Sequence, residues 1–200
     1  MSDGRLRYIA TDRNREPILA VLREVLPPRG LVLELASGSG EHVAHFAVQL
    51  PDLTFQPSDP EAPARASIAA WTSFLELSNV RPPLDLDAAN PPWPIATADA
   101  VLCINMIHIS PWTATQGLMR GAAAILPAGA PLYLYGPYVR AGVDTAPSNM
   151  AFDADLRRRN PQWGLRDLAD VAALAAEHGF SGPTVTEMPA NNLSVVFRRI

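Results

Sequence analysis

A short apolar segment that runs into a glycine-rich turn constrains the fold of this chain more than any other feature. Residues 31–35 read Leu-Val-Leu-Glu-Leu, and Ala36-Ser37-Gly38-Ser39-Gly40 follows directly. This pattern is typical of a buried strand that ends in a tight turn. Apolar residues then recur at helical spacing, at positions 43, 46, 47 and 50, before strand character returns at residues 53–56. The segment therefore predicts one βαβ unit.

Strands and helices continue to alternate along the rest of the chain. The apolar patterns predict helices near residues 18–26, 68–75, 113–126 and 168–175, and strands near residues 84–86, 98–105 and 131–136. Such alternation is typical of a parallel sheet. The last two strands, 184–188 and 193–197, are so close in sequence that they are expected to pair as an antiparallel hairpin. We therefore predict an α/β, Rossmann-like fold with a mostly parallel seven-stranded sheet, a C-terminal antiparallel hairpin and helices on both faces.

The length of the chain predicts a single domain over residues 1–200. Its 200 residues are 48% hydrophobic, which suffices for one compact core and is short for two domains. Residues 1–30 are expected to form an N-terminal helical lead. Residues 137–164 show no clear periodicity, and so long an irregular segment in a compact domain predicts a lid over an active site, with ordinary packing of a surface loop as the alternative.

Charge and composition narrow the class of partner. The formal net charge is -4, with acidic and basic residues interspersed, which disfavours nucleic acid and anionic membranes. The first residues lack the apolar core of a signal peptide, and no apolar stretch reaches the roughly 18 residues that span a bilayer. The single cysteine, Cys103, excludes an intrachain disulfide and fits a reducing compartment. We expect a soluble, cytoplasmic protein with a small-molecule substrate, and predict no particular oligomeric state.

The glycine turn predicts a nucleotide-like ligand, because small residues between a strand and a helix let backbone amides approach an anion. The spacing Ala-x-Gly-x-Gly resembles the first motif of class I methyltransferases, whereas Val43 stands where a dinucleotide-binding turn has its third glycine. In those methyltransferases the turn wraps the amino-acid end of S-adenosylmethionine. The resemblance implies cofactor contacts from Glu34, Ala36, Ser37, Gly38 and Gly40.

Acidic residues near this turn are candidates for the rest of the ligand. Asp59 ends the second predicted strand, where a carboxylate can accept hydrogen bonds from both hydroxyls of a ribose. Class I methyltransferases have another acid after the third strand that meets adenine, and Asp87 stands there. Either residue can instead cap a turn, and Asp85 competes with Asp87. Glu34 is expected to bond the turn amides or the ammonium of the ligand, since an unpaired buried carboxylate is costly, with a structural role as the alternative.

Residues 105–112 are expected to line the substrate side, because ligands bind beyond the carboxyl ends of parallel strands. His108 is the candidate general base, and a histidine held by a backbone carbonyl is an equal alternative. His42 and His45 share a helix face, but no third ligand is evident, so no metal is predicted. Further candidates for cofactor, substrate or lid contacts are Asn105, Met106, Trp112, Tyr135, Tyr138, Asn149 and Phe152.

Asn90-Pro91-Pro92-Trp93 reproduces a tetrapeptide with which methyltransferases acting on nucleic-acid base amines hold their target. In those enzymes the tetrapeptide directly follows the fourth strand. Here it precedes residues 98–105, the better candidate for that strand. We therefore expect a structural loop, because Asn next to proline is ordinary turn chemistry. A shift of one strand in the count would restore the catalytic interpretation.

Longer motifs make the chain resemble the methyltransferase-like protein 26 family, formerly a domain of unknown function. They lie at residues 13–19, 35–42, 56–59, 105–110, 135–138 and 160–167. The resemblance implies a class I fold and S-adenosylmethionine as cofactor, without an established acceptor. It also makes Arg13 and Asn14 candidates to close over the cofactor or acceptor, with N-terminal capping of the first helix as the alternative for Asn14.

Together these features predict an S-adenosylmethionine-dependent methyltransferase that aligns a small-molecule nucleophile for in-line displacement. Three other functions stay open at this point. They are a noncatalytic adenosyl-binding module, an NAD-dependent oxidoreductase and a base-amine methyltransferase that uses residues 90–93.

Overall fold

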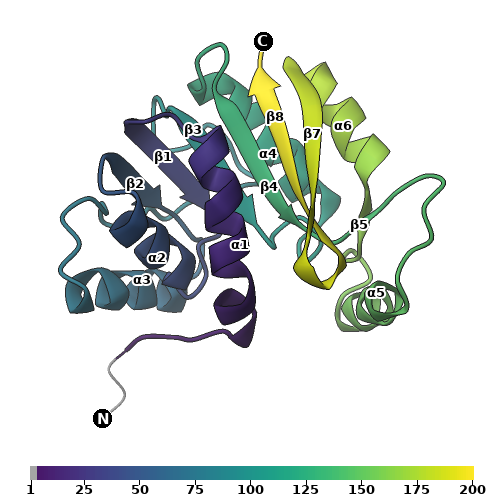
Figure 1. Ribbon diagram of the computed structural model, residues 1–200, viewed down its shortest axis with the longest axis horizontal. Coiled ribbons are helices and arrows are strands. Elements are labelled where there is room, and N and C mark those ends of the chain that lie inside the picture. The colour runs from purple at the N-terminus through teal and green to yellow at the C-terminus, as the bar shows by residue number, and fades with distance from the viewer. Residues whose placement is uncertain (1–3) are drawn as a thin grey trace.

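A twisted sheet with helices on both faces forms the centre of the molecule, shown in Figure 1 as a computed structural model that describes residues 4–200. The sheet has six strands in the order β2-β1-β3-β4-β8-β7. β1 pairs in parallel with β2 and β3, and β3 with β4, whereas β8 runs antiparallel to β4 and β7. The strands are β1 (Gly30–Leu35), β2 (Leu53–Pro57), β3 (Ala100–Ile104), β4 (Pro131–Gly136), β7 (Phe180–Met188) and β8 (Asn192–Arg199). The predicted mostly parallel α/β fold with a C-terminal hairpin is confirmed.

Each face of the sheet carries its own apolar core. On β3, Ala100, Leu102 and Ile104 join one cluster, while Val101 and Cys103 join the other, because neighbouring side chains of a strand point to opposite faces. α1, α2 and α3 cover the first face, and α4 and α6 cover the second (Figure 1). The bounds are α1 (Ile9–Val25), α2 (Glu41–Gln49), α3 (Ala62–Phe74), α4 (Trp112–Ile125) and α6 (Leu168–Glu177).

The seventh strand, expected at residues 84–86, is reduced to isolated bridges. Val80 bridges Phe55 and Leu84 bridges Ser58, both in parallel beside β2. Between these bridges stands Pro82-Pro83. Proline lacks the N–H that a ladder needs, so the pairing is interrupted and the segment contributes no continuous strand.

The segment expected to be irregular, residues 137–164, contains a helix. α5 (Pro147–Arg159) buries only Asn149 and Leu156, so it carries no apolar stripe that a sequence pattern can reveal. Before it, β5 (Tyr138–Val139) pairs in parallel with β6 (Arg166–Asp167) in a separate two-stranded sheet.

The carboxyl ends of the parallel strands meet at the lower edge of the view in Figure 1. The start of α1, helix α5 and the turn η1 (Pro189–Asn191) between β7 and β8 lie along the same edge. Ligand sites of open α/β sheets form at such an edge. Within residues 4–200, no helix combines the length and apolarity needed to cross a membrane.

Candidate functional site

The turn between β1 and α2 is built from alternate residues in the left-handed region. Ala36, Gly38 and Gly40 have φ angles of 52°, 56° and 84°. A Cβ at Gly40 would lie 2.8 Å from the Cα of Ile68 on α3, so glycine is required there by space as well as by conformation. Ala36 holds the same conformation despite its Cβ, and strained backbone of this kind concentrates at functional sites.

Asp59 joins this turn to the end of β2. The main-chain N–H of Gly38 donates to its Oδ2 at 3.0 Å, and the N–H of Glu61 donates to Oδ1 at 2.9 Å. Ser37 lies beside them, because its N–H donates to the carbonyl oxygen of Ser58 at 2.9 Å. The turn and the carboxylate, predicted separately from the sequence, therefore converge at one place.

Glu34 is buried beneath the turn with one oxygen free. Its side chain is 2% exposed, and its Oε2 has no hydrogen-bond partner among the described residues. Burial raises the pKa of this carboxyl to about 8, with a hydrogen bond to Ser37 opposing the shift and the charge of Asp59 adding to it. An unpartnered acid at the floor of a glycine turn fits an ammonium group such as that of S-adenosylmethionine.

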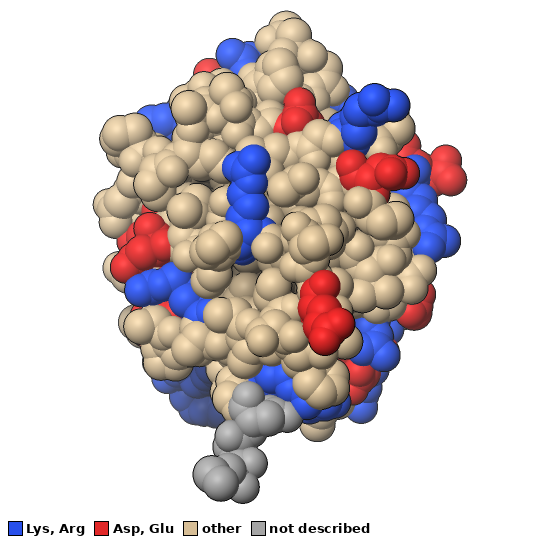
Figure 2. Space-filling view, turned by 90° about the vertical axis from the view of Figure 1, so that its left-hand side faces the viewer, with Lys and Arg blue, Asp and Glu red and all other residues tan. Residues whose placement is uncertain are grey.

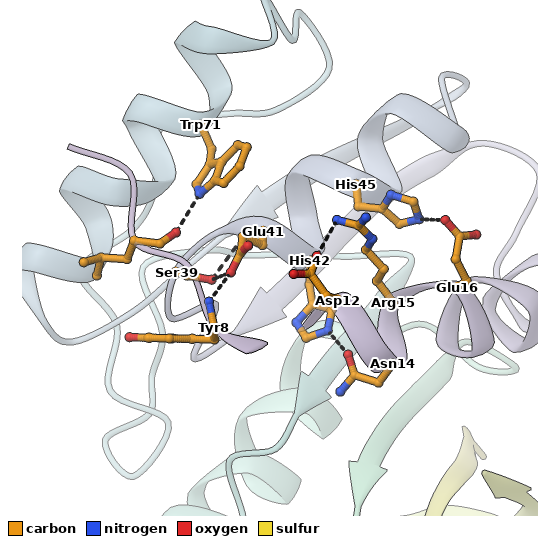
Figure 3. Close-up of polar contacts among 11 residues, drawn as sticks. Tyr8, Asp12, Asn14, Arg15, Glu16, Ser39, Glu41, His42, His45 and Trp71 are labelled. Carbon is orange, nitrogen blue, oxygen red and sulfur yellow. Dashed lines mark hydrogen bonds and ion pairs between the residues drawn. The ribbon is translucent and has the colours of Figure 1, made fainter. Parts of the chain in front are cut away.

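Residues 4–8 pass across the glycine turn on the side of α3 (Figure 3). The N–H of Tyr8 donates to Glu41 Oε2 at 2.6 Å, and the hydroxyl of Ser39 donates to the same oxygen at 3.0 Å. Farther out, the indole N–H of Trp71 donates to the carbonyl oxygen of Leu6 at 3.0 Å. The segment thus fastens the start of the chain to both helices that flank the turn, an arrangement that the sequence analysis missed.

A cavity of about 650 Å³ opens at the same edge of the sheet, and its volume is within the range of small-molecule sites. It is bounded by α1, the loop after β3, the end of β4, helix α5 and the turn η1. Its lining residues are Ala10, Arg13, Asn14, Asn105, His108, Ile109, Tyr135, Pro137, Ser148, Asn149, Phe152, Arg159, Pro189, Ala190 and Asn192. The structure therefore brings together Arg13, Asn14, Asn105, His108, Tyr135, Asn149 and Phe152 among the predicted residues.

His108 is buried in the wall of this cavity and has an unused ring nitrogen. It is 2% exposed, its Nδ1 has no hydrogen-bond partner among residues 4–200, and its ring meets Phe152 edge-on at 5.7 Å between centroids. Burial lowers the pKa of His108 to about 4, and the nearby Arg166 charge adds to the effect. The imidazole is therefore neutral at physiological pH, and the lowered pKa makes it a weaker base than an exposed histidine.

Residues 164–166 hold the loop that carries His108. The N–H of Gly164 donates to the carbonyl oxygen of His108 at 2.9 Å. Arg166 donates to the carbonyl oxygens of Ile107 at 3.0 Å and Ser110 at 2.6 Å. The loop is thus held through its backbone carbonyl oxygens, and the ring of His108 takes no part in these hydrogen bonds.

Asn14 links the glycine turn to the cavity. It is buried on α1, lines the cavity, and its Oδ1 lies 2.8 Å from Nε2 of His42 on α2 (Figure 3). Burial lowers the pKa of His42 to about 3, with the charges of His45 and Arg15 adding to the shift, so its ring is neutral. Asn14 therefore acts across two helices, and not as a cap of its own helix, which begins at Ile9 after Tyr8.

Four of the predicted site residues lie elsewhere. Met106 is 8% exposed and its side chain packs in the core with α4, and Tyr138 is buried in the same core. Trp112 lines a separate surface groove beside Asp170, because α4 begins there and turns its ring away from the cavity. Asp87 is exposed and caps its own loop, accepting from the N–H of Ala89 at 2.9 Å.

The tetrapeptide Asn90-Pro91-Pro92-Trp93 lies in a loop, and its tryptophan is buried. Trp93 is 7% exposed in the core, and a Cβ at Gly121 of α4 would lie 2.3 Å from its ring. The side chain of Asn90 donates to Asp87 at 2.7 Å. An indole packed this closely against a helix has no free face on which a nucleic-acid base can stack.

The cavity also includes residues that the sequence analysis did not select. Pro189 and Ala190 come from the turn η1, Asn192 begins β8, and Arg159 is the last residue of α5. Positive φ angles of 57° at Ala190 and Asn191 mark this turn as strained. The pairing of Asn with Asn at residues 191–192 is the one signal in the sequence for such a conformation, because Asn tolerates the left-handed region.

Charged side chains are mixed on the face that carries α2 and α3. Figure 2 shows blue and red residues interspersed among uncharged ones on this face, with no broad field of one sign. Binding to a phosphate backbone requires a broad positive field, and this face does not have one.

Sheet order, parallel pairing and hairpin give the chain the fold of class I methyltransferases. A family model described as "Protein of unknown function (DUF938)" matches residues 6–199, and the chain belongs to this family.

Solved structures show the same fold. An O-methyltransferase family protein from Burkholderia thailandensis is similar with a TM-score of 0.80 and 18% identity over 95% of this chain. Human N-acetylserotonin methyltransferase, solved in complex with SAM, is similar with a TM-score of 0.76 and 12% identity over 95% of this chain. The chain spans 57% and 52% of those two chains.

Among curated proteins, a tRNA (guanine-N(7)-)-methyltransferase from Agrobacterium fabrum is 33% identical over 88 residues, which is 38% of this chain and 38% of that enzyme.

Proposed function

We propose that this chain is an S-adenosylmethionine-dependent methyltransferase whose acceptor is a small molecule. The observation that carries the proposal is the bond from the N–H of Gly38 to Asp59, a carboxylate close enough to the unpartnered Glu34 for its charge to raise the pKa of Glu34. A glycine turn, a carboxylate for ribose and an acid for an ammonium group meet there. The solved relative that holds SAM, and the shared fold, support the choice of cofactor.

In this proposal the residues of the turn hold the cofactor at the edge of the sheet. Asp59 uses one lone pair of each oxygen for Gly38 and Glu61, and a carboxylate has further lone pairs for the hydroxyls of a ribose. Glu34 pairs with the ammonium group, because an unpartnered buried carboxylate is costly. When bound, the cofactor supplies an activated methyl group.

The acceptor occupies the cavity between α1 and α5. Asn14 and Asn105 lie on its wall, where their amides orient the acceptor, and Phe152 excludes water from the side of His108. In this proposal His108 takes the proton of the acceptor nucleophile as the methyl group is transferred, because its neutral ring lies in the wall of the cavity. α5, within residues 137–164, covers the cavity as the lid.

The family resemblance and the location are part of the same proposal. Membership in the methyltransferase-like protein 26 family is supported by the motifs at residues 35–42 and 105–110, which lie at the turn and in the wall of the cavity. We propose one domain over residues 1–200 that works in the cytoplasm on a small molecule, with nucleic acid disfavoured by the net charge of -4.

The direct test is calorimetric titration of the purified chain with S-adenosylmethionine, with NAD as the comparison ligand. Binding of the first and not the second is expected, since Val43 is buried where a dinucleotide-binding turn needs glycine. The reverse preference would overturn the proposal in favour of an oxidoreductase. The chain is also incubated with S-adenosylmethionine and fractions of a cell extract. Cofactor binding without methyl transfer to any fraction would identify the chain as a noncatalytic adenosyl-binding module.

A further inference from the structure

We propose that the cavity between α1 and α5 binds a small organic anion, a carboxylate or phosphate carried on an apolar or aromatic body. This inference rests on the proposed function, because it names the class of acceptor for that same cavity.

The charged side chains at the cavity are arginines. Arg13 comes from α1 and Arg159 from the last residue of α5, and no Asp or Glu is among the described residues that line the cavity. The chain as a whole has 20 acidic and 16 basic residues, so its net charge is negative, whereas the charged residues that line the cavity are positive. Two guanidinium groups without a carboxylate favour an anion and disfavour a cationic acceptor.

Both arginines are available to a ligand. Arg13 is exposed and makes no hydrogen bond or ion pair with any described residue. The guanidinium of Arg159 lies over the Trp163 ring, 5.3 Å from its centroid, and 3.9 Å from Asp155, at the outer limit of an ion pair. Because guanidinium groups bind carboxylate and phosphate through paired N–H donors, a ligand anion can replace this weak contact.

The part of the cavity around His108 is uncharged and partly aromatic. The exposed Phe152 meets His108 edge-on at 5.7 Å between ring centroids, and the buried Tyr135 lies in the same wall. The arginines are exposed whereas His108 is 2% exposed, so the positive end is the outer one. An acceptor with its anion outward therefore presents its far end, with the nucleophile, to His108.

Matched phenols test the charge preference without any need for turnover. The full chain is titrated with 4-hydroxybenzoate, 4-hydroxyphenyl phosphate, the neutral 4-hydroxybenzamide and the cationic 4-hydroxybenzylamine, with and without S-adenosylhomocysteine. We expect the anions to bind at least about ten-fold more tightly than the amide, the amine to bind least, and the difference to shrink at high salt. The stronger of the two anions identifies carboxylate or phosphate as the recognised group.

Single substitutions assign the preference to the two arginines. Arg13→Gln and Arg159→Gln should each weaken binding of the better anion by about ten-fold and leave the amide unchanged. Arg158→Gln is the matched control, since Arg158 precedes Arg159 on α5 and does not line the cavity. Equal binding of acid and amide, unchanged affinity in both variants, or failure of both anions to bind would overturn the inference.

The outcomes separate this inference from the proposed function. Cofactor binding without an anion preference contradicts the inference alone. Absence of cofactor binding, with the anion preference intact, contradicts the methyltransferase and leaves an anion-binding cavity.

Discussion

The main-chain N–H of Gly38 donates to Oδ2 of Asp59 across 3.0 Å, and this bond ties the turn after β1 to the end of β2. Asp59 is 6% exposed, so the bond lies in a largely dry environment where an unpaired donor is costly. The same carboxylate is the proposed partner of the ribose. A substitution at Asp59 therefore affects both the stability of the turn and the binding of the cofactor, and the two effects can be measured separately.

Asp59→Ala should lower the free energy of unfolding by about 1–3 kcal/mol, because the N–H of Gly38 loses its partner. It should also weaken S-adenosylmethionine by at least about ten-fold, since the ribose hydroxyls are left unpaired. Urea denaturation without cofactor measures the first effect, and calorimetric titration of the folded variant measures the second. Asp52→Ala is the control, because that exposed carboxylate precedes β2 and makes no hydrogen bond or ion pair with any described residue. Full cofactor affinity in Asp59→Ala would show that Asp59 only shapes the turn.

Glu34→Gln should change the pH dependence of stability. The folded pKa of about 8 lies above the ordinary value of 4.5, so between these values the folded chain binds more protons than the unfolded chain. Stability from this group is complete below the lower value and is lost as the pH rises toward the upper one. Glutamine does not titrate, so the difference in unfolding free energy between variant and native chain should grow from pH 4.5 to pH 8 and then level off.

The affinity for the cofactor should depend on pH in the opposite direction to the stability contributed by Glu34. Pairing with an ammonium group requires ionised Glu34, so binding releases a proton and the affinity of the native chain should rise with pH up to about 8. Glu34→Gln should bind more weakly and lose this rise. Titration calorimetry in buffers of different ionisation enthalpy measures the released proton. A Glu34→Gln variant with native affinity and an unchanged pH profile would contradict the assignment of Glu34 to the ammonium group.

How far the sequence predicts this site depends on what positions each residue. Gly38 and Asp59 follow the ends of two adjacent parallel strands, β1 and β2, so the strand pattern alone predicts that they lie close together. Met106 also follows a strand, but the direction in which a loop side chain turns is set by packing, and it turns into the core. Arg159 reaches the cavity only because α5 docks there, and α5 has no apolar stripe from which docking can be predicted.

His108→Gln should slow methyl transfer by about 100- to 10,000-fold, the usual contribution of a general base. Cofactor affinity should stay native, because His108 lies in the acceptor cavity. The native rate should be independent of His108 titration near pH 7 and fall as the pH drops through about 4, where the ring gains its proton. Single-turnover rates at saturating cofactor test both statements. Native rates in the variant would leave His108 as a structural histidine only.

Protonation of His108 should also destabilise the fold in acid. Its folded pKa of about 4 lies below the ordinary value of 6.5, so the unfolded chain binds more protons between them. Stability from this group is complete above pH 6.5 and is lost as the pH falls toward 4. His108→Gln should therefore lose less stability than the native chain between these pH values in urea titrations. An identical slope in both proteins would contradict a buried neutral ring.

Trp93 should matter for folding and not for the chemistry. Its ring packs in the core against Gly121, so Trp93→Ala should cost about 3–5 kcal/mol of unfolding free energy. Gly121→Ala places a Cβ 2.3 Å from the ring and should cost about 1–3 kcal/mol by overpacking.

Asn90→Ala tests the catalytic role of the tetrapeptide in a protein that stays folded. Asn90 is exposed and bonds only Asp87 among the described residues, so its loss should cost little stability. In a base-amine methyltransferase Asn90 would hold the target amine, and its loss would abolish transfer. Here Asn90→Ala should retain native turnover, and an inactive but stable Asn90→Ala protein would restore the catalytic role of this tetrapeptide.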